Sequence, residues 1–218
     1  MSKLKYNTSN LLNKILNLKV LVLLSNLIFQ GIPYMTFGEK LYKISITLFF
    51  ALMFYLMMGD IILSLCFGHV LNYIVNGQFF VVYRYIGKKD TMNFSILKDF
   101  LLLIQRQSEI FNPIDILFTG SFSKGTMSRQ SDLDIRIYHK AGFVNSVKSY
   151  IMASVLRFSG LLMKFPIDVY CFSDLKFLGP NKVHPSEIPV HIRGEEEFLR
   201  EFPNSCQLNT QVENLVIK

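Results

Sequence analysis

Hydrophobic residues fill the first third of the chain, with few of the polar positions that a water-facing helix shows. The stretch from Val20 to Phe37 has no charged residue, and the stretch from Ile44 to Tyr83 is broken only by Asp60 and His69. A helix needs about 20 apolar residues to cross a bilayer. The pattern therefore predicts membrane helices at about residues 16–37 and 44–66, with an apolar continuation to residue 83.

The number of membrane helices stays open because of Asp60. In a helix that begins after Lys43, Asp60 lies about 26 Å along the axis. That position is near the far interface, where a carboxylate costs much less than at the bilayer centre. Residues 61–83 then continue the helix, lie in the interface or return as a further span. We expect two membrane helices, or three if this last segment crosses.

The second half of the chain has shorter apolar segments at regular intervals. Apolar positions recur at helical spacing from Ile96 to Ile110 and from Phe143 to Phe158. Short apolar runs around residues 116–118, 133–137 and 167–169 predict strands, and Pro189 makes residues 188–192 a last, edge strand. The expected domains are a membrane region at 1–87, a linker at 88–94, an α/β domain at 95–195 and a polar tail at 196–218.

The charged residues orient the hydrophobic part. The chain has 23 Lys and Arg against 16 Asp and Glu. Basic residues lie before the first apolar stretch and after the second, which predicts a multi-pass membrane protein with both ends in the cytoplasm. Anionic lipid head groups explain much of the positive charge. The absence of a long basic run and of Trp leaves no strong signal for nucleic acid.

Two other interpretations of the hydrophobic part remain. Residues 1–30 have the composition of a secretory signal, although the second stretch would still keep the chain after residue 84 inside. Alternatively, residues 20–83 form a buried core or a partner surface. The apolar residues lack periodic polar faces, which favours lipid. The three cysteines have no metal-ligand spacing, and a reducing compartment suits them.

Candidate chemistry is concentrated between residues 116 and 138. The first strand ends at Gly120-Ser121, where glycine lets the backbone approach a ligand and a following helix would direct free N–H groups at an anion. The second strand carries Asp132 and Asp134 on one face, together with Arg136. Two carboxylates on one face suit Mg²⁺, which binds a few carboxylates together with phosphate oxygens.

A third carboxylate is expected from Asp168. It lies in another short strand, and the helix between the two strands allows them to pair in parallel. Asp168 then comes beside the strand of Asp132 and Asp134. Three such carboxylates can hold two metal ions about 3.5–4 Å apart, an arrangement that activates an attacking oxygen and stabilises the leaving one.

The pattern Gly-Ser-x-x-x-Gly-x-x-x-x-x-Ser-Asp-x-Asp resembles the signature of the DNA polymerase β-like nucleotidyltransferases, most closely their minimal branch. The resemblance covers about residues 95–195. It implies a minimal nucleotidyltransferase fold, a small mixed sheet with flanking helices, preceded here by the membrane helices. It also implies attack of a hydroxyl on the α-phosphorus of a nucleoside triphosphate, with release of pyrophosphate.

The resemblance implies roles for individual residues. Gly120 and Ser121 would bind the nucleotide phosphates, Asp132 and Asp134 would bind both Mg²⁺ ions, and Asp168 would complete one metal site and help to deprotonate the acceptor. Many minimal members have an arginine shortly after Gly-Ser; here Lys124 can meet a phosphate as a point charge. Arg136 contacts a phosphate or an acceptor, or pairs with an aspartate.

The acceptor and the nucleotide base stay open. A membrane anchor suggests a lipid-linked glycan or a membrane-bound acceptor. Two alternatives are a nucleotide-binding regulatory or antitoxin-like module without turnover, and a protein adenylyltransferase. The small catalytic part has no obvious substrate domain, so a homo-oligomer or another protein partner could complete the cleft.

Overall fold

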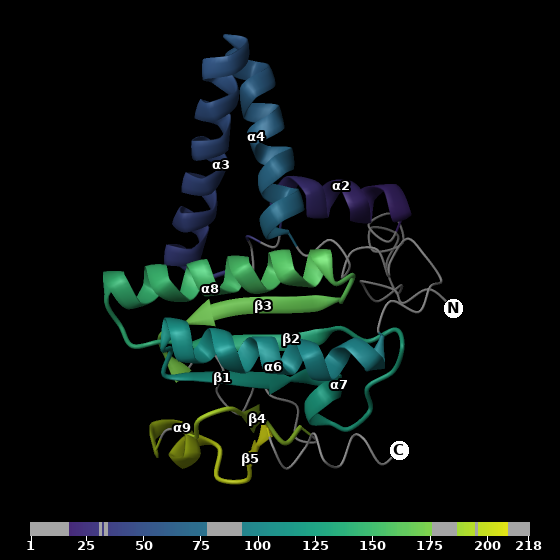
Figure 1. Cartoon of the computed structure of the whole chain (residues 1–218), viewed down its shortest axis with the longest axis vertical. Coiled ribbons are helices and arrows are strands. Elements are labelled where there is room, and N and C mark those ends of the chain that lie inside the picture. Colours follow the sequence, from purple (N-terminus) through teal and green to yellow (C-terminus); the bar gives the residue numbers. More distant parts are fainter. Residues whose placement is uncertain are drawn as a thin grey trace.

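The computed structural model describes residues 18–30, 32, 35–77, 93–175, 187–194 and 196–208. Its centre is a mixed five-stranded sheet in the order β3-β2-β1-β4-β5 (Figure 1). β1 pairs antiparallel with β2 and β4, whereas β2 with β3 and β4 with β5 are parallel pairs. The strands are β1 Asp115–Thr119, β2 Leu133–Tyr138, β3 Ile167–Phe172, β4 Val190–His191 and β5 Cys206–Gln207.

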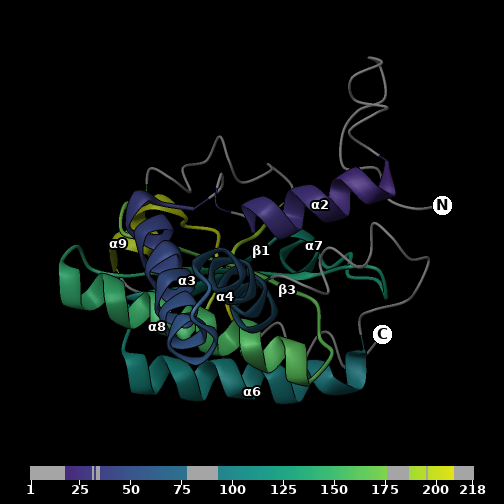
Figure 2. The same cartoon turned by 90° about the horizontal axis from the view of Figure 1, so that it is seen from above.

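Two long helices cover one face of the sheet. α6 (Phe94–Phe111) and α8 (Phe143–Leu162) lie on the same side of the strands (Figure 2). Both were expected from apolar spacing, and each is a few residues longer than the periodic segment. Leu133, Ile135 and Ile137 of β2 are fully buried, as a period of two requires. The apolar residues of β2 therefore serve the core, and its polar residues face the other side.

The C-terminal segment is part of the fold rather than the expected polar tail. α9 (Glu196–Glu201) and β5 follow β4, and Phe198 is fully buried in a cluster with Leu117 and Phe172. β5 also pairs with β4, so β4 lies inside the sheet and not at its edge as Pro189 had suggested. Residues 196–208 thus extend the α/β domain; residues 209–218 lie outside the described part.

The hydrophobic N-terminal region contains three described helices with bounds that differ from those expected at 16–37 and 44–66. They are α2 (Lys19–Phe29), α3 (Phe37–Met58) and α4 (Ile61–Asn76). α3 begins earlier because Thr36 caps it, and it ends at Gly59, whose φ is 72°. Asp60 then caps α4 by accepting from the Leu63 N–H, so it breaks the helix instead of lying within it.

α3 and α4 form a helical hairpin that projects from the α/β domain above α8 (Figure 1). Among the described residues, only Phe37–Met58 is long and apolar enough to cross a membrane. α4 is a shorter apolar helix, so the expected second and third spans are not found there. Residues 78–83 and nearly all of the expected linker at 88–94 lie outside the described residues.

The base of the hairpin is fixed to β3 by a buried ion pair. Arg157 of α8 lies 2.6 Å from Glu39 of α3, and both side chains are 1% exposed. Burial opposes the charge of Arg157, but the Glu39 carboxylate outweighs this and raises the pKa of the guanidinium. The same two side chains bond the outer edge of β3: Arg157 donates to the Val169 carbonyl, and Glu39 accepts from the Cys171 N–H.

A second group of buried bonds joins the ends of the three helices. The Lys43 ammonium donates to the carbonyl of Gln30 at 2.7 Å and to that of Asn76 at 3.2 Å. Asn72 donates to the carbonyl of Lys43, and the Asn76 side chain accepts from Arg157. The hairpin and the α/β domain therefore share one polar core at their junction.

Candidate active site

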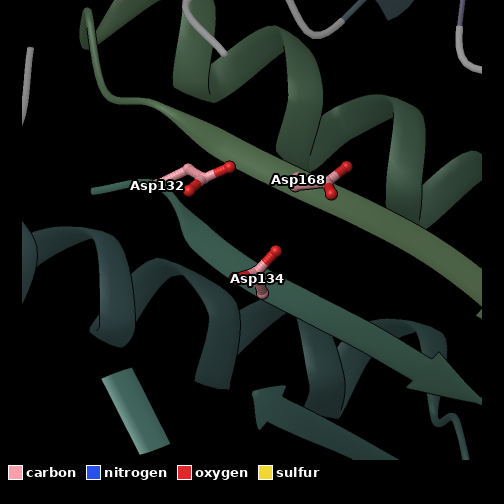
Figure 3. Close-up of side chains that lie close together, drawn as sticks. All are labelled: Asp132, Asp134 and Asp168. Atoms are coloured by element: carbon pink, nitrogen blue, oxygen red, sulfur yellow. The ribbon is translucent and has the colours of Figure 1, made fainter. Parts of the chain in front are cut away.

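Three carboxylates converge at one end of the paired strands β2 and β3. Asp132 precedes β2, Asp134 lies within it, and Asp168 is the direct neighbour of Asp134 in the parallel register. One oxygen from each carboxylate lies within 4.8 Å of the other two, and the three side chains face a common space (Figure 3). Among the described residues, this is the one group of acidic, His or Cys side chains with a spacing that fits a metal ion.

Arg136 lies beside this acidic cluster. Its guanidinium is 3.8 Å from the Asp134 carboxylate and 4.0 Å from that of Asp168, and it stands 4.9 Å from the centre of the Tyr170 ring. Of the roles expected for Arg136, pairing with aspartates is the one that the structure contains. Arg136 thus contacts two of the three carboxylates, and carboxylate oxygens at this spacing suit a divalent cation.

The Gly120 backbone packs directly against Asp134. Gly120 has a φ of 70°, and a Cβ at this position would lie 2.0 Å from the Asp134 Oδ2. Register explains the approach, because Thr119 is the antiparallel partner of Asp134 across β1 and β2. A side chain at residue 120 would therefore push the aspartate out of the cluster. The loop and the acidic cluster form one continuous site.

The short helix α7 (Gly120–Ser123) carries an unusual polar side chain. The hydroxyl of Ser121 is buried and has no hydrogen-bond partner among the described residues. A buried hydroxyl without a partner is costly, and such groups often mark a ligand site. Its place directly after Gly120 fits the expected contact with a phosphate.

Glu187 occupies the other side of the loop. Its carboxylate accepts a 3.2 Å hydrogen bond from the Gly120 N–H and lies 3.1 Å from the Lys124 ammonium. Gly120 and Lys124 are two of the residues expected to hold phosphate. Glu187 was not expected at the site, because it is 67 residues from Gly120 and belongs to no recognisable spacing. The one sequence signal for Glu187 is that an acidic residue stands directly before the apolar segment 188–192.

The structure brings most of the expected site residues together. The three aspartates, Arg136 and Gly120 are neighbours through the contacts above, while Lys124 reaches the site through Glu187. The cysteines are elsewhere: Cys171 is buried at the hairpin junction, where burial raises the pKa of its thiol well above the ordinary value. A cysteine nucleophile therefore has no support at this site.

Comparison with known families agrees with this geometry. The family model described as "Nucleotidyltransferase domain" matches residues 102–193, a segment that includes every side chain of the site. The chain has no significant match among curated proteins or among solved structures. The fold is a mixed α/β sheet with flanking helices, consistent with that domain. Residues 102–193 therefore match a nucleotidyltransferase domain, which supports a nucleotidyltransferase enzyme.

Proposed function

We propose that the protein transfers a nucleotidyl group from a nucleoside triphosphate to a hydroxyl acceptor, in a reaction that requires Mg²⁺. The observation that carries this proposal is the convergence of Asp132, Asp134 and Asp168 beside the Gly120-Ser121 loop. Hard oxygen ligands at this spacing fit two magnesium ions that share the triphosphate. The orphaned Ser121 hydroxyl gives the phosphate a place on the loop.

The three aspartates have different tasks in this proposal. Asp132 and Asp134 would hold both ions, and Asp168 would complete one site and receive the proton of the acceptor hydroxyl. When bound, the metal ions supply Lewis acidity to the attacking oxygen and charge neutralisation to the leaving pyrophosphate. Arg136 lies within 4.0 Å of the Asp134 and Asp168 carboxylates, so its charge would compete with the metal ions for them.

Triphosphate binding would replace an internal contact. Lys124 and the Gly120 N–H now face the Glu187 carboxylate, an anion of the protein itself. A triphosphate would compete for both donors, since a cation and a backbone N–H bind phosphate oxygens as readily as a carboxylate. Glu187 therefore lowers the apparent affinity for nucleotide without taking part in the transfer.

We place the reaction at the cytoplasmic face of a membrane. Support comes from the exposed apolar hairpin, from the basic residues that flank the hydrophobic region, and from the cytoplasmic location of nucleoside triphosphates. The acceptor would then be a hydroxyl near the bilayer surface, on a lipid-linked molecule or on a membrane protein.

The test is pyrophosphate release by purified protein in detergent, with each triphosphate, with and without Mg²⁺, in the presence of membrane lipid extract. Asp132→Asn should abolish Mg²⁺-dependent release while the melting temperature is retained. Asp99→Asn, which removes an exposed carboxylate on α6, is the matched control and should keep full activity. Full release by the Asp132 variant would refute the assignment. Tight nucleotide binding without product in the wild type would indicate a binding module.

A further inference from the structure

The surface of the α3–α4 hairpin is apolar on all of its outer sides. Between Ile44 and Asn76 the sequence has one charged residue, Asp60. Exposed side chains occur on every part of both helices and at the tip, where Leu56 and Met57 are 77% and 79% exposed and Ile62 is 70% exposed. A helix that docks in a protein groove keeps a polar face for water. This hairpin has no such face, so lipid suits it better than a groove in a protein partner.

Three hydroxyl groups and the carboxylate at the tip have hydrogen-bond partners within the hairpin. The hydroxyls of Ser45, Thr47 and Ser64 donate to carbonyls one turn earlier, and the Asp60 carboxylate accepts from the Leu63 N–H. Lipid offers no hydrogen bonds, so only segments with internally satisfied backbone and side chains enter it. These side chains meet this condition, and a single capped carboxylate at the tip is a small cost against the apolar surface.

Both ends of the hairpin are held on the same side. Glu39 and Lys43 at the start of α3 are buried at the junction, and so are Asn72 and Asn76 at the end of α4. A chain that leaves the α/β domain and returns to it must cross a membrane an even number of times. The hairpin therefore crosses either twice or not at all.

The lengths of the helices decide between these possibilities. The part of α3 beyond the junction, from Ile44 to Met58, spans about 22 Å at 1.5 Å per residue. The whole of α4 has 16 residues, about 24 Å, and its last turn is buried at the junction. The hydrocarbon core of a bilayer is about 30 Å thick. The whole of α3 is long enough to cross it, but the part of α3 beyond the buried junction is too short, and so is α4.

We propose that the hairpin enters the bilayer from the cytoplasmic side and returns without emerging on the other side. This inference deepens the membrane location proposed above and does not depend on the reaction. α2 extends sideways from the lower part of α4, to which Gln30 and His69 bond it (Figure 1). Its exposed residues include Val20, Leu24 and Phe29, so α2 would lie along the membrane surface. The α/β domain would then be held at a fixed distance from the lipid surface.

The experiment places a single reactive cysteine at the hairpin tip. Ile61→Cys is made in a background with Cys66→Ser and Cys206→Ser, and Glu201→Cys on α9 is the matched water-facing control. Each full-length protein is reconstituted into vesicles of phosphatidylethanolamine and phosphatidylglycerol. A membrane-impermeant maleimide is then applied outside, trapped inside, or added after detergent. Circular dichroism and the melting temperature in detergent verify that each variant is folded.

The proposal expects the tip cysteine to react only after detergent, while residue 201 reacts in intact vesicles from its own side. Labelling of residue 61 from the side opposite to residue 201 would show a transmembrane hairpin and overturn the proposal. Labelling of residue 61 from the same side, at the rate of residue 201, would show that the tip is outside lipid and would equally overturn it. Neither result would affect the assignment of the reaction.

Discussion

Strand β3 has a charged cluster on each side, and the two clusters have opposite relations to water. On one side Asp168 joins Asp132, Asp134 and Arg136, and the ion-paired side chains there are about one fifth exposed. On the other side Glu39 and Arg157 are 1% exposed and bond the free edge of the strand. The first cluster brings three carboxylates together, whereas the second is an ion pair in a junction that also buries Lys43. The first cluster therefore offers carboxylates to a cation, whereas the second holds the hairpin to β3.

Burial gives the two clusters different energetic roles. A buried ion pair contributes little net stability, but removal of one partner leaves an uncompensated charge and is strongly destabilising. Like charges in a partly exposed cluster repel one another, so removing one of them should not destabilise the fold. The two clusters should therefore respond to mutation in opposite ways.

The largest effect is expected from Asp168→Asn. The substitution keeps the shape of the side chain but removes a carboxylate from the acidic cluster, so metal binding and proton acceptance both fail. We expect transfer to fall about a thousandfold or more, equivalent to about 4 kcal/mol. Unfolding in detergent, followed by circular dichroism, should show equal or higher stability. A variant that is active but unstable would show that Asp168 is structural and would remove the contrast between the clusters.

Arg157→Met should give the reverse result. It leaves the Glu39 carboxylate buried without its partner, for which a loss of roughly 3–5 kcal/mol in the free energy of unfolding is expected. Glu39→Gln combined with Arg157→Met should recover part of this loss. Arg200→Met is the matched control, because Arg200 forms an exposed pair with Glu196 and its loss should cost less than about 1 kcal/mol. Equal melting temperatures for Arg157→Met and the control would refute the structural role.

The sequence predicted one of these clusters and missed the other for a physical reason. Asp134 and Asp168 come together because strand periodicity sets their side and the intervening helix makes their strands parallel. These are local rules that act over a few dozen residues. Glu39 and Arg157 are 118 residues apart, and nothing near either residue indicates the contact. Glu39 and Lys43 stand beside the charge-poor stretch that begins at Ile44, and both are buried at the junction.

The helix boundaries show a similar limit. Hydropathy located the apolar region but not its turn, because Gly59 and Asp60 are ordinary helix-ending signals that a long apolar stretch hides. The C-terminal segment differs from the expected polar tail because its few apolar residues contact distant parts of the chain. Phe198 and Leu208 are buried, although the residues beside them in the sequence are mostly polar. The side chains that cover them belong to strands far away in the sequence.

A smaller effect should follow from Glu187→Gln. The change weakens the contact of residue 187 with Lys124 and the Gly120 N–H, so a triphosphate meets less competition. We expect the KM for the nucleotide to fall roughly three- to tenfold with kcat nearly unchanged, since the lost contact is charge-assisted but partly exposed. Glu196→Gln on α9 makes the same charge change on the exposed surface and should leave KM as it is. A raised KM would mean that Glu187 supports the loop instead of competing for it.

The smallest effect, and the one that refines the acidic cluster itself, is expected from Arg136→Met. Arg136 lies within 4.0 Å of two carboxylates that would bind magnesium, so its charge competes with the metal. If pairing with the aspartates is its role, the Mg²⁺ concentration for half-maximal transfer should fall a few-fold, because each contact is partly exposed and screened. If Arg136 instead contacts a phosphate in the working complex, Mg²⁺ dependence should stay constant and the KM for nucleotide should rise. Arg136→Lys keeps the charge and loses the planar guanidinium, so it should retain the wild-type Mg²⁺ dependence in the first case only. Titration of Mg²⁺ at saturating nucleotide, and of nucleotide at saturating Mg²⁺, distinguishes the two roles. Pairing with the aspartates changes the half-maximal Mg²⁺ concentration, whereas contact with a phosphate changes the KM for the nucleotide.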